Sequence, residues 1–127
     1  MKRELKKRTG NQREAAPDTL ALVRELRGVL ASKKGESIVL LDMTSLSSLT
    51  DYYVIVSGGS APHLKALTRA VHDAMKPHGR YAYRKSGEPE SGWVTLDYID
   101  FVIHILDEEL RDYYRLEELW AQAPRVD

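Results

Sequence analysis

Two strand-like runs that almost touch constrain the fold of this chain more than any other feature. Residues 92–98 and 100–106 are rich in β-branched, aromatic and aliphatic side chains, and only a very tight connection separates them. Strands joined so closely pair as an antiparallel hairpin, because a parallel pair needs a long crossover. Residues 93–120 also set carboxylates and large aromatic rings among these strand formers, a mixture that suits a recognition surface better than a plain core.

Three further strands are predicted outside the hairpin. Uniformly apolar runs at residues 38–41 and 52–56 are typical of strands that are buried on both faces. Residues 81–84 form a third short run, which the turn-rich residues 86–91 separate from the hairpin. A helix follows the run at 52–56, and this strand-helix-strand order implies a crossover and therefore a mixed sheet.

Three helices are predicted around these strands. Apolar residues recur at three- and four-residue spacing between Pro17 and Gly35, which indicates an amphipathic helix. Ser60 can cap a second helix that ends at Pro77, and residues 110–120 predict a third. The sequence therefore predicts an α/β fold of two or three layers, with a mixed five-stranded sheet flanked by helices.

Size and composition favour one soluble domain. The chain has 127 residues, 43% of them hydrophobic, which suffices for a single core, expected over residues 17–127. It has no cysteine, so disulfides, thiolate metal ligands and thiol nucleophiles are excluded. No apolar run approaches the roughly 18 residues that span a bilayer. We expect a cytoplasmic protein.

Charge is distributed unevenly although the formal net charge is zero. Residues 1–16 hold six basic and two acidic residues and carry +4, so the remaining chain carries −4. We expect this tail to be a disordered, solubilising leader, with an RNA-touching arm as the alternative. The mildly acidic body predicts little direct nucleic-acid contact, because phosphate neutralisation needs clustered cations, and it suits a basic protein partner.

A turn at Gly58, Gly59 and Ser60 raises the possibility of phosphate binding. It follows a predicted strand and precedes a predicted helix, where backbone N–H groups and the helix dipole converge. Nucleotidyl transfer would also need closely spaced carboxylates for a divalent metal. Asp97 and Asp100 are the nearest substitute, but they are three residues apart across a turn. The pattern therefore favours a relic of such a fold over a live site.

The histidines do not predict a metal site. No pair among His63, His72, His78 and His104 has the i, i+4 spacing that places two imidazoles on one helical face. His104 lies within an apolar strand and is interpreted as a packed or hydrogen-bonded residue rather than a general base. The sequence also lacks a Gly-x-Ser-x-Gly nucleophile motif. We therefore expect no cofactor, no metal and no catalytic residue.

The strand at residues 92–98 offers the strongest candidate for a contact surface. Period-two alternation places Trp93 and Asp97 on one face, and Leu96 and Tyr98 on the other. One face must meet the helices, so the other is covered by the C-terminal segment or open to a partner. Trp93 either packs on an aromatic residue of that segment, such as Tyr114, or anchors an interface.

These features resemble the ribosome-silencing factor family, also called Iojap or RsfS, from about Asp18 to Val126. The family is similar in fold to nucleotidyltransferases, so the resemblance implies a nucleotidyltransferase-like topology. One departure is Thr95, in a stretch that is usually apolar. The matching residues are Leu41-Asp42, Leu49-Thr50-Asp51-Tyr52, Gly58, Ser60, Trp93, Leu96-Asp97-Tyr98, Asp100, Val102, His104, Arg111, Tyr114, Leu116-Glu117 and Leu119-Trp120.

The resemblance implies a translational repressor without catalysis. Such a factor binds the large ribosomal subunit through its fourteenth large-subunit protein, blocks joining of the small subunit sterically and acts when nutrients are scarce. One alternative is that the free protein forms a homodimer. The other is that the chain is a nucleotidyltransferase-like nucleotide-binding protein or enzyme. The expected contact strand comprises Trp93, Leu96, Asp97 and Tyr98, with Asp51, Tyr53 and Tyr114 as rim or support.

Overall fold

The computed structural model describes residues 16–126. The prediction of a basic tail over residues 1–16 therefore lies outside the described residues, apart from Ala16. None of the helices within 16–126 is long and apolar enough to cross a membrane. The elements, in chain order, are α1 (Pro17–Ser32), β1 (Glu36–Asp42), β2 (Tyr52–Gly58), α2 (Ala61–Met75), the 3-10 turn η2 (Lys76–His78), β3 (Arg84–Ser86), the 3-10 turn η3 (Pro89–Ser91), β4 (Trp93–Asp97), β5 (Phe101–Asp107), α3 (Glu108–Tyr114) and α4 (Leu116–Leu119).

One five-stranded mixed sheet organises the fold, with the strand order β1-β2-β5-β4-β3. β2 and β5 run parallel at its centre, and all other neighbours are antiparallel. β4 and β5 form the predicted antiparallel hairpin, with Trp93 opposite Leu106 and Asp97 opposite Val102. The predicted mixed five-stranded sheet flanked by helices is confirmed, whereas the nucleotidyltransferase-like label stays a prediction.

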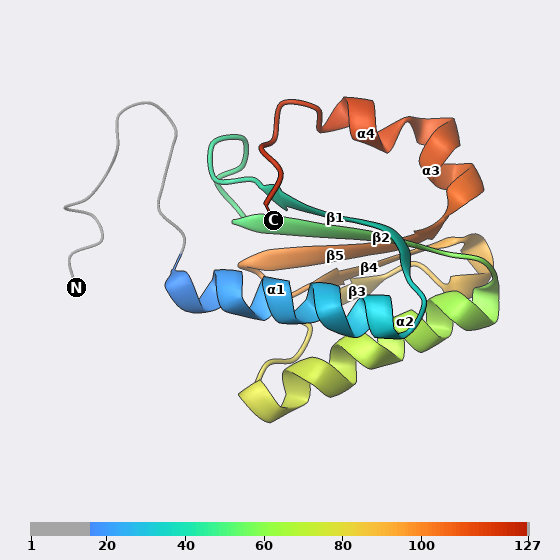
Figure 1. Ribbon diagram of the computed structural model, residues 1–127, viewed down its shortest axis with the longest axis horizontal. Coiled ribbons are helices and arrows are strands. Elements are labelled where there is room, and N and C mark those ends of the chain that lie inside the picture. The colour runs from blue at the N-terminus through green and yellow to red at the C-terminus, as the bar shows by residue number, and fades with distance from the viewer. Residues whose placement is uncertain (1–15, 127) are drawn as a thin grey trace.

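α1 and α2 cover one face of the sheet (Figure 1). Leu26 and Leu30 of α1 and Leu67 and Val71 of α2 are fully buried there, as the spacing of apolar residues predicts. Burying one such side chain contributes about 2 kcal/mol, so this layer is the main hydrophobic core. Pro17 occupies the first turn of α1, where its missing N–H costs no hydrogen bond.

The C-terminal segment covers part of the other face (Figure 1). The Asp107 side chain caps α3 by accepting a hydrogen bond from Leu110 N at 2.8 Å. Arg115 adopts a left-handed conformation (φ 50°) and divides the predicted single helix over residues 110–120 into α3 and α4. The chain then returns to the sheet edge, where Asp42 N donates to the carbonyl of Pro124 and Val126 N donates to that of Leu40.

The third strand lies later in the chain than the sequence predicts. β3 begins at Arg84 rather than Tyr81, because its partner β4 ends at Asp97 and leaves residues 81–83 little strand to pair with. Gly87, just after β3, has φ 83°, and a Cβ there would overlap the carbonyl oxygen of Trp93. The turn therefore requires glycine, and it holds the start of β4 against the end of β3.

Candidate partner-binding surface

β4 and the residue after it present their side chains alternately to the two faces of the sheet. Trp93, Thr95 and Asp97 are half-buried on the face opposite α1 and α2. Leu96 and Tyr98 are each 4% exposed and belong to the helix-covered core. The predicted alternation is confirmed. Leu96 and Tyr98, expected in the contact strand, therefore lie on the helix-covered face and not on the face of Trp93.

Five aromatic rings gather on the partly covered face and form what we call the aromatic surface: Tyr53, Trp93, His104, Tyr114 and Trp120. The ring centroid of Trp93 lies 5.8 Å from that of Tyr114, and Tyr53 lies 5.0 Å from Trp120 in an edge-on arrangement. Tyr114 is 52% exposed, while Tyr53, Trp93 and Trp120 are half-buried. Trp93 therefore both packs on Tyr114 and keeps part of its ring open to solvent.

His104, on β5, is the buried member of this aromatic surface. The Trp93 Nε1–H donates to His104 Nδ1 at 3.3 Å, and the Tyr53 and Trp120 rings lie 4.8 and 5.2 Å from the imidazole. Burial lowers the pKa of His104 to about 4, so the ring is neutral at pH 7. Its Nε2 is buried without a hydrogen-bond partner among the described residues. His104 thus orients Trp93, in agreement with its interpretation as a hydrogen-bonded strand residue.

Two carboxylates lie at the end of the sheet where β4 finishes. Asp97 Oδ1 accepts a hydrogen bond from Ile99 N at 2.7 Å, and its charge, after burial, raises the pKa of Tyr53. Asp51 directly precedes β2 and donates its backbone N–H to the carbonyl of Asp100. Asp97 therefore forms the turn and also adds negative charge near Tyr53.

A buried arginine attaches α3 and α4 to the sheet. Arg111 is 3% exposed, and its guanidinium donates to Ser57 Oγ at 2.7 Å and to Glu117 Oε2 at 2.7 Å. These contacts satisfy a cation that would be costly to bury alone. Because Arg111 precedes the break at Arg115 and Glu117 follows it, the pair also fixes the angle between the two short helices.

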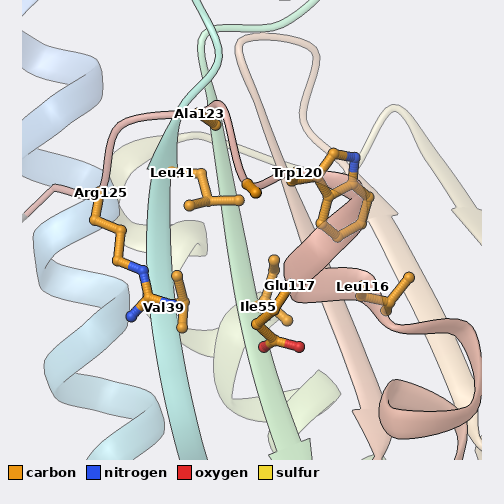
Figure 2. Close-up of a pocket in the computed structure, with 9 residues that line it drawn as sticks. Val39, Leu41, Ile55, Leu116, Glu117, Trp120, Ala123 and Arg125 are labelled. Carbon is orange, nitrogen blue, oxygen red and sulfur yellow. The ribbon is translucent and has the colours of Figure 1, made fainter.

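A small pocket lies between the sheet and the C-terminal segment (Figure 2). It encloses about 210 Å³, and Figure 2 shows Glu117 and Arg125 flanking an otherwise apolar lining. Sequence reasoning missed this pocket, because the return of the chain to β1 leaves no periodic signal. The apolar lining residues are Val39, Leu41, Ile55, Leu116, Trp120, Ala121 and Ala123.

The turn after β2 does not have the surroundings that a phosphate needs. The Ser60 hydroxyl accepts a hydrogen bond from His63 N at 3.2 Å, and Gly59 N donates to His63 Nδ1 at 2.9 Å, so both groups are occupied by the start of α2. Five acidic residues line the depression around this turn, and their charge repels anions. They are Glu36, Glu90, Asp107, Glu108 and Glu109.

The carboxylates considered for nucleotidyl transfer lie far from that turn. Gly58 pairs with Asp107 at one end of the sheet, whereas Asp97 pairs with Val102 near the other end. Asp100 forms an ion pair with Arg80 and accepts a hydrogen bond from the Thr19 hydroxyl at 3.0 Å. The fold thus separates Ser60 from both candidate metal ligands. Within residues 16–126, no group of three or more His, Asp or Glu side chains is placed to hold a metal ion.

Comparisons with known proteins agree with the sequence resemblance. The family model described as "Ribosomal silencing factor during starvation" (RsfS) matches residues 16–127. Ribosomal silencing factor RsfS of Bacillus subtilis is 36% identical over 95 residues, which cover 75% of this chain and 80% of that protein. A mouse protein named "Mitochondrial assembly of ribosomal large subunit protein 1" is 31% identical over 102 residues, covering 76% of this chain and 43% of its own length.

A solved structure has the same fold. The crystal structure of a protein from Chromobacterium violaceum superimposes with a TM-score of 0.75 at 32% sequence identity, and the match covers 80% of this chain and 85% of that one. The family model spans nearly the whole described region, including every element that builds the aromatic surface. The chain therefore belongs to the ribosomal silencing factor (RsfS) family.

Proposed function

We propose that this protein silences ribosomes by binding the large ribosomal subunit through its fourteenth large-subunit protein, and that the bound protein blocks joining of the small subunit. The observation that carries the proposal is the partly open sheet face, which presents three half-exposed aromatic rings and, near Tyr53, the Asp97 carboxylate. Aromatic side chains supply much of the energy of protein interfaces. Family membership supplies the ribosome as the target.

The contact residues that we propose follow from exposure. Trp93, Tyr53 and Tyr114 form the anchor, and Asp97 provides an acidic edge for a basic partner. Asp51 is assigned to the rim because it precedes β2 at the same end of the sheet as Asp97. Leu96 and Tyr98 are left out because both are buried. These four anchor and edge residues come from β2, β4 and α3, so one surface joins three elements.

The mode of action that we infer is regulatory binding in the cytoplasm, without catalysis. The family description names ribosome silencing during starvation, and the mouse relative is named for assembly of the large ribosomal subunit. Both names concern the ribosome rather than a reaction. The separation of Ser60 from Asp97 and Asp100 favours this reading over a nucleotidyltransferase-like enzyme.

Co-sedimentation with isolated ribosomal subunits tests the proposal. Wild-type protein should pellet with large subunits and not with small ones, and Trp93→Ala should lower its affinity for large subunits at least tenfold. Leu49→Ala is the control, because Leu49 is exposed in the loop between β1 and β2. Circular dichroism establishes that each variant folds. Wild-type protein that does not pellet with large subunits would refute the proposal.

Two further measurements separate the finer steps. The purified fourteenth large-subunit protein should capture wild-type protein but not Trp93→Ala. In sucrose gradients, prior incubation of large subunits with wild-type protein should reduce joining to small subunits, and Trp93→Ala should restore it. Subunit binding without any effect on joining would eliminate the steric block and leave only ribosome association.

We also propose that the free protein forms a homodimer through the same aromatic surface. Exposed apolar side chains extend from it along the C-terminal helices, including Tyr113, Tyr114 and Leu119. Burying them in a second copy would remove an apolar patch from water. Light scattering after size exclusion should give a dimeric mass for wild type and a monomeric mass for Trp93→Ala. A wild-type monomer at micromolar concentration would rule this out.

A further inference from the structure

A basic groove runs between α2 and the β3 edge of the sheet, on the side of the molecule that carries the helices. Its volume is about 520 Å³, and its lining includes four cationic side chains: Lys65, Arg69, Lys76 and Lys85. Asp73 is the acidic residue of this lining, and it lies 3.8 Å from Arg69 in an exposed pair that is worth little. The groove is therefore strongly positive within a body whose total charge is negative.

The cations are arranged in a line. Lys65, Arg69, His72 and Lys76 follow one another at spacings of four, three and four residues, which places the first three on one face of α2 and Lys76 in line with them at its C-cap. At 1.5 Å per residue this row is about 16 Å long. Lys85 faces it across the groove, and Lys33 continues the basic surface beyond Lys65 in an adjoining depression. A row of this length matches an extended polyanion better than a compact ligand.

One exposed aromatic ring borders the same groove, and a second directly precedes β3. Tyr81 is 56% exposed, and its ring centroid lies 6.0 Å from that of His72, a residue of the lining. Tyr83 is 66% exposed, and the Arg84 guanidinium lies over its ring at 5.7 Å. Large exposed rings beside a row of cations are the combination that binds single-stranded nucleic acid, because bases stack on the rings while cations contact the phosphates.

We propose that this groove binds the phosphate backbone of single-stranded RNA, with Lys65, Arg69, Lys76 and Lys85 as the phosphate contacts. The average charge of the body predicts little nucleic-acid contact, but that average conceals the local row on α2. The aromatic surface lies on the opposite face of the sheet from this groove. One molecule can therefore use both surfaces at once.

Direct binding to an unstructured RNA tests the groove without the ribosome. The probe is a fluorescein-labelled 20-nucleotide oligouridylate, and the protein is the full chain. Wild-type protein should bind it at low salt, and the logarithm of the affinity should fall linearly with the logarithm of the salt concentration. Three neutralised contacts should reduce that slope by about 2 and the affinity at low salt at least tenfold.

Two charge-matched variants locate the site. The groove variant carries Lys65→Gln, Arg69→Gln and Lys76→Gln, substitutions that keep helix propensity nearly constant. The control variant carries Lys34→Gln, Arg115→Gln and Arg125→Gln, which remove the same charge away from the groove. Both retain residues 1–16, so any contribution of that basic segment cancels. If both variants weakened oligouridylate binding equally, the groove would not be the binding site. A wild-type protein that binds no oligouridylate would also refute the proposal.

A competitor identifies the class of polyanion. Oligouridylate should displace the labelled probe at a concentration at least tenfold lower than polyglutamate of equal charge, because polyglutamate offers no bases to stack on Tyr81. Equal competition would assign the groove to an acidic protein and refute the RNA proposal. The Trp93→Ala variant should bind oligouridylate like wild type. Loss of RNA binding and loss of ribosome binding can therefore be told apart. Only the idea that the RNA belongs to the large subunit rests on the proposed function.

Discussion

The two faces of the sheet are stabilised in different ways. On one face, α1 and α2 bury a continuous layer of aliphatic side chains that are almost inaccessible to solvent. On the other, two short helices cover only part of the sheet over a smaller cluster of buried apolar side chains, beside a buried arginine and half-exposed aromatic rings. The helix-covered face therefore supplies most of the stability, while the other face keeps apolar surface available to a partner.

Truncating a core leucine should have the largest effect on stability. Leu67 is fully buried between α2 and the sheet, so Leu67→Ala should lower the free energy of unfolding by about 3 kcal/mol. Leu119→Ala, on the exposed side of α4, should change it by less than about 0.5 kcal/mol. Urea denaturation monitored by circular dichroism measures both. Equal losses would break the distinction between the two faces.

Acidification should destabilise the partly open face through His104. Burial lowers its pKa from 6.5 in the unfolded chain to about 4 in the folded protein, so between these values the unfolded state binds more protons. The stability that depends on a neutral His104 is therefore present above pH 6.5 and is lost as the pH falls toward 4. From pH 7.5 to 4.5, wild type should lose about 2 kcal/mol more than His104→Gln, as measured by urea denaturation. Parallel profiles would exclude this role.

Neutralising the partner of Arg111 should have a smaller effect. Glu117→Gln leaves Arg111 buried with Ser57 and an uncharged amide, but the Glu117 side chain is 44% exposed, so solvent already screens the pair. We expect a loss of about 1 kcal/mol, with faster hydrogen exchange in α3 and α4 than in α2. Glu118→Gln is the control, because its contact with Arg115 is exposed. Unchanged exchange in α3 would show that Arg111 does not attach this segment.

The sequence predicts the features that local periodicity controls. Helical spacing locates α1 and α2, and alternation in β4 separates Trp93 and Asp97 from Leu96 and Tyr98. Alternation alone does not say which of the two faces the helices cover. Motif matching therefore grouped Leu96 and Tyr98 with the contact residues, although α2 covers their face.

Features that depend on long-range contacts are not predictable in this way. The break at Arg115 requires a left-handed backbone that its sequence does not demand, and the Arg111 to Glu117 pair stabilises the resulting angle. The return of residues 124–126 to the edge of β1, which encloses the small pocket, has no periodic signature either. The row of cations along α2 does have a periodic signature in the sequence, but a charge averaged over the whole body conceals it.

Removing the charge of Asp97, at the edge of the aromatic surface, should weaken ribosome binding with little effect on stability. Asp97→Asn keeps a side-chain oxygen for Ile99 N, so the free energy of unfolding should change by less than about 0.5 kcal/mol. The pKa of Tyr53 should fall, because the Asp97 charge is one cause of its elevation, and ultraviolet titration of the tyrosines detects this. Binding to large subunits should weaken several-fold and depend less on salt.

Asp112→Asn is the matched control for that experiment, since Asp112 is an exposed carboxylate on α3 with the same charge. It should leave the Tyr53 titration unchanged and reduce subunit binding less than Asp97→Asn does. If the two variants weakened binding equally, total negative charge would account for the attraction to the ribosome, and the position of Asp97 near Tyr53 would have no special part in it. A selective effect of Asp97→Asn would place the acidic edge of the interface at the end of β4.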